Sequence, residues 1–233
     1  MSIYAISDLH LSINNPKPMN IFGPVWDNYL EAIEKDWAEK IGDDDIVLLS
    51  GDLSWAMRLE DAKSDIDYIS ALKGKKVIIR GNHDYWWKSI SAVRALLPEG
   101  SYAVQNDAVK IGNNVICGSR LWMTPEYGKT QAAEDKTIYD RELLRLTMSL
   151  ESAKKLMTEG DRLFVMVHYP PFNSTFASTV FTDKIAEYAP EAVVYGHLHG
   201  SSSRVCRKLV LNGVTYYLTS CDLVGNKLVK IAD

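Results

Sequence analysis

The stretch KKVIIRGNHDYWW, residues 75–87, joins a short apolar segment to a loop of polar side chains. Its first five residues are rich in β-branched side chains, which favours a buried strand. Gly81 ends this segment, and Asn82, His83 and Asp84 follow directly. Since open α/β sheets bind ligands at the carboxyl ends of their strands, the stretch predicts a strand whose following loop carries a functional site.

The same arrangement recurs wherever the chain has a histidine. The other segments and the polar residues that follow them are 2–7 with Asp8 and His10, 45–50 with Asp52, 162–167 with His168, and 192–195 with His197 and His199. A single histidine at a strand end is more often structural than functional. All five histidines of this chain lie at such ends, which chance explains poorly, so we interpret the set as one site.

Short apolar strands alternate with amphipathic helices, which predicts an α/β fold. Further strands are predicted at 102–105, 108–111 and 114–118, and a closing antiparallel meander at 204–211, 214–219 and 223–231 around the turn Asn212-Gly213. This is too many strands for one doubly wound sheet. We therefore expect two packed sheets with helices outside.

Three helices follow from the 3.6-residue periodicity of the apolar side chains. They are expected at 25–40, 58–72 and about 134–158. In the third, Leu144, Met148 and Leu156 are predicted to face inward. The third helix and the loop before it, about 124–158, are also a candidate cap over the site.

Composition narrows the class of protein. A chain of 233 residues with 46% hydrophobic and 24% charged residues fits one globular domain spanning 1–233. A net charge of −4 argues against an obligate nucleic-acid partner and against an anionic membrane, and the apolar runs are too short to span a bilayer. The start MSIYAISDLHL lacks the features of a signal peptide. Three widely spaced cysteines favour a reducing cytoplasm.

The order of these motifs resembles the calcineurin-like metallophosphoesterase superfamily, within it the bacterial-type predicted phosphohydrolases. The motifs are Asp8-Leu9-His10, Gly51-Asp52, Gly81-Asn82-His83-Asp84, His168 and Gly196-His197-Leu198-His199. They occur in family order from residue 8 to residue 199. The resemblance implies a four-layer αββα sandwich, with two mixed β-sheets flanked by helices and a metal site at the C-terminal ends of the strands.

The resemblance also implies two divalent cations. It assigns Asp8, His10, Asp52 and His199 to the first metal, and Asp52, Asn82, His168 and His197 to the second. Asp52 would bridge the cations, and a water between them would become a hydroxide nucleophile near neutral pH. Manganese is our first choice of metal, while iron, zinc and nickel also accept these donors.

His83 is the one histidine that this assignment leaves without a metal. The resemblance makes it the acid that protonates the leaving oxygen or stabilises the transition state. Asp84 would hold the His83 ring and favour its protonated form. An equally good interpretation of Asp84 is a helix N-cap before Tyr85-Trp86-Trp87.

The sequence does not determine which residues contact the substrate. Residues on or near the predicted rim include Arg58, Lys88, Arg120, Tyr169 and Asn173. Arginine suits bidentate phosphate binding, but a surface arginine is usually only solvated. Four tryptophans lie near the motif loops, namely Trp55, Trp86, Trp87 and Trp122. They either line a substrate pocket or belong to the core.

Two differences from known subgroups of the superfamily narrow the choice of subgroup for this chain. The chain has GDLSWAM where protein Ser/Thr phosphatases carry Gly-Asp-x-x-Asp-Arg-Gly, and Trp55 stands where purple acid phosphatases have a tyrosine ligand. The expected activity is a phosphomonoesterase or phosphodiesterase acting on a small molecule or nucleotide. The alternatives are a nuclease for DNA or RNA, a non-catalytic metal-binding scaffold, and a zinc hydrolase of another bond. Nothing in the sequence indicates an oligomeric state.

Overall fold

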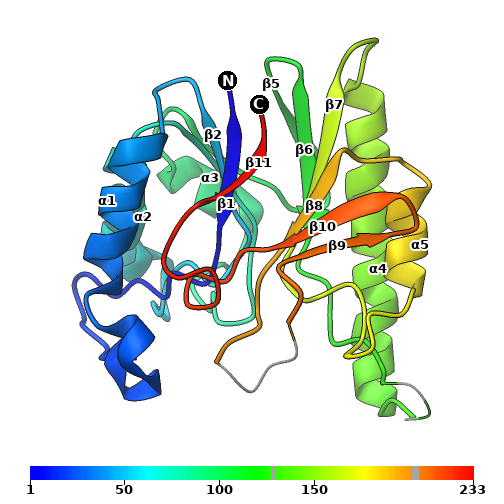
Figure 1. The fold of residues 1–233 in the computed structure, drawn as a ribbon, viewed down its shortest axis with the longest axis horizontal. Coiled ribbons are helices and arrows are strands. Elements are labelled where there is room, and N and C mark those ends of the chain that lie inside the picture. Colours follow the sequence, from blue (N-terminus) through cyan, green and yellow to red (C-terminus); the bar gives the residue numbers. More distant parts are fainter. Residues whose placement is uncertain (127, 129, 201–204) are drawn as a thin grey trace.

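The computed structural model describes residues 1–126, 128, 130–200 and 205–233. Two mixed β-sheets pack face to face, and helices cover the outer face of each sheet (Figure 1). The two ends of the chain lie close together at one end of the sheets (Figure 1). These are the layers of an αββα sandwich, so the predicted fold class is confirmed.

The first sheet has the strand order β11-β1-β2-β3-β4. Its strands are β1 (Ile3–Ile6), β2 (Ile46–Leu49), β3 (Lys75–Ile78), β4 (Ser101–Ala103) and β11 (Val229–Ala232). Strands β1 to β4 are parallel, and β11 pairs antiparallel with β1 at the edge. The helices of this half are α1 (Tyr29–Lys40), α2 (Leu59–Ala71) and α3 (Ile90–Leu96). Their apolar side chains pack on the outer face of the sheet.

The second sheet has the strand order β5-β6-β7-β8-β10-β9. Its strands are β5 (Ala108–Ile111), β6 (Asn114–Ser119), β7 (Arg162–Val167), β8 (Ala192–Tyr195), β9 (Lys208–Leu211) and β10 (Val214–Leu218). The four central strands are parallel, while β5 and β9 are antiparallel edges. The outer face packs on α4 (Ala133–Leu156) and α5 (Val180–Ala186).

The two sheets meet through an apolar layer of their own. Ile46 and Val77 of the first sheet contribute to it, as do Ile116, Phe164 and Met166 of the second. All of these side chains are at most 2% exposed. Because central strands such as β2 are buried on both faces, they are apolar along their whole length, which explains the sequence IVLL of β2.

Several predicted elements differ from the observed ones. The helix expected at 25–40 begins only at Tyr29, and residues 24–26 form a separate 3-10 turn after a first such turn at Met19–Phe22. The break lies at Asp27, whose backbone is extended, and at Asn28, whose backbone is left-handed with a φ of 51°, so a helix cannot continue through them. The short helices α3 and α5 were not predicted, because seven residues give too few apolar repeats to show a period.

The predicted closing meander is correct for one hairpin and wrong for its third strand. Strands β9 and β10 pair antiparallel around Asn212 and Gly213, both of which have positive φ, as a tight hairpin turn requires. The last strand, β11, joins β1 in the other sheet instead. Residue 204, the first of the predicted strand 204–211, lies outside the described residues.

The inward face of α4 is not the predicted one. Leu144, Met148 and Leu156 are 66%, 55% and 39% exposed, whereas Leu146 and Leu150 are fully buried against the second sheet. Both sets of residues recur at helical spacing, so the sequence alone did not separate them. The long helix is thus an outer layer of the sandwich, and the expected cap stays a prediction for the loop before it, of which residues 127 and 129 lie outside the described chain.

No helix in the described part of the chain is both long enough and apolar enough to cross a membrane. The cysteines form no disulfide, and Cys117 and Cys221 are buried among apolar side chains. Burial raises the pKa of the Cys117 thiol to about 12, so this cysteine is an inert core residue.

Candidate metal centre

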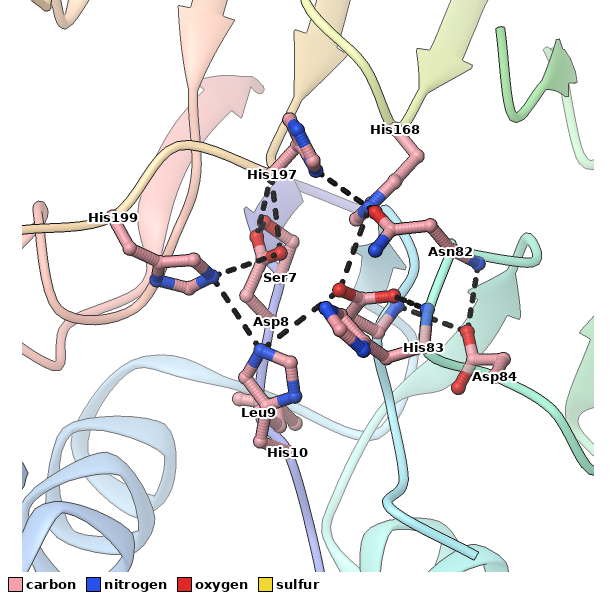
Figure 2. A network of polar contacts seen from close by, with 12 residues as sticks. Ser7, Asp8, Leu9, His10, Asn82, His83, Asp84, His168, His197 and His199 are labelled. Carbon is pink, nitrogen blue, oxygen red and sulfur yellow. Dashed lines mark hydrogen bonds and ion pairs between the residues drawn. The ribbon is translucent and has the colours of Figure 1, made fainter. Parts of the chain in front are cut away.

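Side chains from the ends of several parallel strands converge at one edge of the sandwich (Figure 2). The loops after β1, β2 and β3 bring residues from the first sheet, and the loops after β7 and β8 bring residues from the second. These loops are also bonded to each other across the two sheets, because His168 Nδ1 donates to Ser50 O at 2.9 Å and His197 N donates to Asp8 Oδ1 at 3.1 Å. The site thus exists only where the two sheets meet.

Asp8, His10 and His199 form the first group of possible metal donors, with one atom of each within 4.8 Å of the others. The Nε2 atoms of His10 and His199 face one another at 3.4 Å, and His199 Nε2 lies 3.5 Å from Asp8 Oδ1. Such a set of imidazole nitrogens and a buried carboxylate is the donor chemistry of a divalent transition metal.

Asn82, His168 and His197 form a second convergent set (Figure 2). The amide oxygen Oδ1 of Asn82 lies 2.7 Å from His168 Nε2 and 2.8 Å from His197 Nδ1. His168 Nδ1 lies 2.9 Å from the carbonyl oxygen of Ser50, to which it donates. The amide oxygen of Asn82 only accepts, so His168 Nε2 and His197 Nδ1 meet it either through a proton or through a shared cation.

Asp52 lies between these two sets. Its Oδ2 atom is 3.9 Å from His10 Nε2 and 3.5 Å from His168 Nε2, while its Oδ1 accepts the backbone N–H of His83 at 2.7 Å. A further donor group consists of Asp8, Asp52 and His168. A carboxylate in this place can contact two cations at once.

The backbone at the site is held in an unusual conformation. Asp8, His10, Asp52 and His197 all have positive φ, between 47° and 70°. This left-handed conformation is uncommon for residues other than glycine and concentrates at functional sites, where the surrounding structure enforces it. Here the bonded loops supply that enforcement.

Gly81 and Gly196 allow the loops to come close. A Cβ atom at Gly81 would lie 2.1 Å from Asp52 Oδ1, and one at Gly196 would lie 2.3 Å from Asp8 Oδ2. Both glycines directly precede a candidate ligand, and the backbone comes close to a buried carboxylate at both positions. Any side chain here would push a carboxylate out of the site.

Burial keeps two of the imidazoles in the neutral form that binds metals. It lowers the pKa of His10 to about 3, although Asp8 opposes the shift, and it lowers the pKa of His197 to about 3. For His199, burial also lowers the pKa, but hydrogen bonds with Asp222 and Asp8 outweigh it and raise the pKa to about 10.

The two carboxylates respond differently to the same surroundings. Burial would raise the pKa of Asp8, but a hydrogen bond with His199 and the charges of the neighbouring histidines hold it well below the ordinary value. Burial raises the pKa of Asp52 to about 7, the charge of His168 opposes this, and the carboxylates of Asp8 and Asp84 add to it. A bound cation reduces the repulsion between buried carboxylates that lie this close together.

Asp84 does not hold the His83 ring, so that prediction is wrong. Its carboxylate accepts the backbone N–H of Asp52 at 2.9 Å, of Leu53 at 3.0 Å and of Gly81 at 2.7 Å. It also accepts Trp86 Nε1–H at 2.9 Å. Residues 85–87 form no helix, so the N-cap interpretation is wrong as well. Asp84 is a positioning residue that ties the loop after β3 to the loop after β2.

His83 lies at the mouth of the site, beside the metal donors. Its ring centroid is 5.7 Å from that of His10 and 4.8 Å from that of Trp55, and its side chain is only partly buried. Burial lowers its pKa, and the opposing charge of Asp84 does not reverse the shift. The expected protonated form is therefore not favoured, and a neutral ring with one N–H donor faces the cavity.

Asp222 is a functional residue that the sequence reasoning missed. It lies 3.0 Å from His199 Nδ1 and accepts the backbone N–H of Gly200 at 2.9 Å. The bond fixes the His199 ring so that Nε2 faces the other donors. A signal was present, because Asp222 follows β10 as the other ligand-type residues follow their strands.

The three predicted substrate contacts lie in different places relative to the site. Arg58 is exposed before α2 and has no hydrogen bond or ion pair to the described part of the site. Arg120 faces a separate pocket on α4, where it lies 3.5 Å from Glu142. Asn173 lines a cavity next to His197, but its Oδ1 atom accepts hydrogen bonds from its own loop.

Two cavities border the donor cluster. One, of about 390 Å³, lies against His10, His83 and His199 and has a largely apolar wall of Met19, Phe22, Trp26 and Trp55. The other, of about 360 Å³, lies against His197 and is lined by residues of the loops 123–126 and 169–176.

The predicted tryptophan cluster divides between pocket and core. Trp55 stacks on His10 with a centroid distance of 4.6 Å, whereas Trp86 and Trp87 are buried in the core. Trp122 packs on Tyr169, whose own ring contacts His197. The first cavity therefore has an aromatic wall beside the metal donors, and Trp26, which was not among the predicted four, completes it.

Comparison with known families decides the class. A family model described as calcineurin-like phosphoesterase matches residues 1–201. The chain belongs to this family. Membership makes the chain a hydrolase of phosphate esters and implies divalent metal ions, and the Asp/His groups at the strand ends are able to bind them.

Solved structures share the fold at low sequence identity. The phosphopantetheinyl hydrolase PptH from Mycobacterium tuberculosis superposes with a TM-score of 0.56 at 15% identity, covering 99% of this chain and 95% of that one. A protein of unknown function from Aquifex aeolicus, AQ665, gives a TM-score of 0.51 at 14% identity, covering 98% and 95%. No curated protein matches the chain.

Proposed function

We propose that this calcineurin-like phosphoesterase hydrolyses small phosphate esters at a centre of two divalent cations. The observation that carries the proposal is the position of Asp52, whose Oδ2 atom lies between His10 of one donor set and His168 of the other. Asp8, His10 and His199 would hold one cation with Asp52. Asn82, His168 and His197 would hold the second with the same carboxylate.

The residues present fit such a centre. The ring nitrogens of His168 and His197 lie within 2.8 Å of the amide oxygen of Asn82, and His10 and His199 face each other through ring nitrogens. These nitrogen and oxygen atoms would offer their lone pairs to the bound cations. The mixed oxygen and nitrogen donors suit manganese, which we propose first, and iron, zinc or nickel are the alternatives. When bound, two such cations lower the pKa of a water between them and neutralise charge on the phosphoryl group.

The chain's own side chains would complete the reaction. A phosphoryl group at the cluster places its leaving group in the apolar cavity, because His83 and Trp55 both line that cavity. The N–H of the His83 ring then donates to the leaving oxygen as charge develops on it. Asp84 acts through position alone, by holding the loops that carry Asp52 and His83.

The apolar cavity favours one kind of substrate. Its wall of Met19, Phe22, Trp26 and Trp55 suits an aromatic ring or a nucleobase in the leaving group. We therefore propose a small-molecule or nucleotide phosphate ester, monoester or diester. The name of the phosphopantetheinyl hydrolase from Mycobacterium tuberculosis adds a phosphopantetheinyl ester to the substrates to be tested.

The test is hydrolysis of p-nitrophenyl phosphate and bis-p-nitrophenyl phosphate by protein stripped of metal and then supplied with manganese. We expect turnover that depends on manganese, with one of the two esters preferred. Turnover that persists in excess chelator would contradict the metal centre. Two bound cations per chain without turnover on either ester or on a nucleotide panel would contradict catalysis and support a scaffold.

A further inference from the structure

A second charged cavity lies beside the metal centre and takes no part in it. It has a volume of about 240 Å³ and is lined by five basic side chains, Arg80, Lys88, Arg120, Arg141 and Arg145. Arg80 and Lys88 lie between β3 and α3, Arg120 directly follows β6, and the other two lie near the middle of α4. We call this cavity the basic pocket.

The charge of the basic pocket is not balanced by its lining. Of the described residues that line it, Glu142 is the one acidic side chain. Its carboxylate is already engaged, by Arg145 at 2.6 Å, Ser119 Oγ at 2.9 Å and Arg120 at 3.5 Å. Four positive charges are left in excess, in a chain whose net charge is −4.

The donors in the pocket are unusually free. Within the described residues, Arg80, Lys88 and Arg141 make no hydrogen bond or ion pair, and the buried Nε–H groups of Arg80 and Arg120 have no partner. By contrast, Lys136 near the start of α4 is paired with Asp140 at 2.6 Å. A buried donor without a partner costs free energy unless a ligand satisfies it.

The pocket is close to the metal centre but separate from it. Arg80 precedes the candidate ligand Asn82 by two residues, and the carbonyl oxygen of Arg120 accepts the N–H of Tyr169 at 3.0 Å. Tyr169 in turn follows His168 directly. None of the residues that line the basic pocket lines the two cavities at the cluster.

We propose that the basic pocket binds a phosphate-type oxyanion at a site distinct from the metal centre. Guanidinium groups match the geometry of phosphate oxygens through paired N–H donors, and several of them around one cavity favour a multiply charged anion. Such an anion has two sources. It is either a second phosphate of the substrate whose ester lies on the cations, or a free phosphate that acts from outside the reaction.

The direct test is calorimetric titration of the manganese-loaded full chain with inorganic phosphate. We expect two sites in the wild type, one at the cations and one in the basic pocket. The double variant Lys88→Gln/Arg141→Gln should weaken one site at least about tenfold and leave the other unchanged. Both side chains are exposed and without partners in the described chain, so the variant should keep its fold.

The matched control is Lys154→Gln/Lys155→Gln, which removes the same charge from exposed positions at the far end of α4. It should retain both sites with wild-type affinity. Titration without manganese should leave the site in the pocket, which separates this proposal from that of the metal centre. A single phosphate site in the wild type, or two unchanged sites in the double variant, would overturn the proposal.

Steady-state kinetics then distinguishes the two possible sources of the anion. If the pocket holds a second phosphate of the substrate, the double variant raises the KM for adenosine 3′,5′-bisphosphate about tenfold and leaves that for p-nitrophenyl phosphate unchanged. If the anion is free phosphate, added phosphate changes the turnover of p-nitrophenyl phosphate without competing with it, and the double variant loses this response.

Discussion

At the scale of single residues, the same types of side chain serve two purposes at this site. Asp8 and Asp52 face the donor cluster, whereas Asp84 and Asp222 accept hydrogen bonds from the loops and from His199. All four are buried carboxylates at strand ends. Their chemistry is therefore set by which N–H groups reach them, and this cannot be read from residue type.

His83→Ala should separate metal binding from turnover. The ring lies beside the cluster and belongs to neither donor group, so the variant should bind manganese like the wild type. Loss of a donor to the leaving oxygen should lower kcat about 10²- to 10⁴-fold. Metal analysis and kcat on p-nitrophenyl phosphate measure the two effects, and loss of metal in this variant would refute the assigned role.

The sequence located these residues and left their partners open. Five histidines at strand ends were enough to predict one site, because parallel strands bring their carboxyl ends to one edge. The partners of Asp84 were hidden, since they are backbone N–H groups of another loop. Asp222 was missed because its ring partner, His199, is 23 residues away in the sequence.

At the scale of elements, α4 shows the limit of periodicity. Its outward residues Leu144 and Met148 are spaced as a core stripe would be, yet Leu146 and Leu150 lie against the sheet. Periodicity establishes that a helix exists, and the sheet decides which of two faces is covered. The wrong face was predicted for this reason.

A matched pair of substitutions tests the observed face of α4. Leu146→Ala removes a fully buried side chain and should lower the free energy of unfolding by about 2–5 kcal/mol. Leu144→Ala removes an exposed one and should change it by less than about 0.5 kcal/mol. Chemical denaturation measures both, and the reverse order would show that the helix packs through its other face.

The buried side chain of Lys76, which contacts the end of α2, makes the stability of the fold depend on pH. Its Nζ donates to the carbonyl oxygens of Ser70 and Leu72, and burial lowers its pKa to about 8 from the ordinary 10.5. Between these values the unfolded chain binds more protons than the folded one, so this group makes stability rise with pH across that window.

The prediction is that the wild type gains stability relative to Lys76→Met as the pH is raised from 8 to 10.5. Denaturation at several pH values measures the difference in the free energy of unfolding between the wild type and the variant. The contributions of other titrating groups cancel in this difference. Lys75→Met is the matched control, because it removes the same charge from the neighbouring position. An equal trend in both variants would exclude Lys76 as the cause.

At the scale of the whole molecule, the site is a junction of the two sheets. Asp8, Asp52 and Asn82 follow strands of one sheet, and His168 and His197 follow strands of the other. The apolar layer between the sheets fixes their distance, and the donors complete the contact at the edge. The two-sheet architecture followed from the strand count, while the place of β11 did not, since edge pairing across sheets leaves no local signal.

Metal binding should therefore stabilise the entire fold. Cations that bind only the folded chain add RT ln(1 + [L]/Kd), which is about 2.7 kcal/mol at a hundredfold excess over Kd. Thermal unfolding with increasing manganese should show a rising Tm in the wild type. Magnesium at the same concentration is the control for ionic strength, and a Tm that manganese does not move would argue against a centre that joins the sheets.

The central claim is that Asp52 is shared by two cations that phosphate-ester hydrolysis requires. Its most direct test is to count the manganese bound per chain in the wild type and in Asp52→Asn, while the turnover of p-nitrophenyl phosphate is measured on the same samples. We predict two manganese ions per chain in the wild type, and loss of most metal and nearly all turnover in the variant. An Asp52→Asn protein that keeps two ions and wild-type turnover would contradict the account.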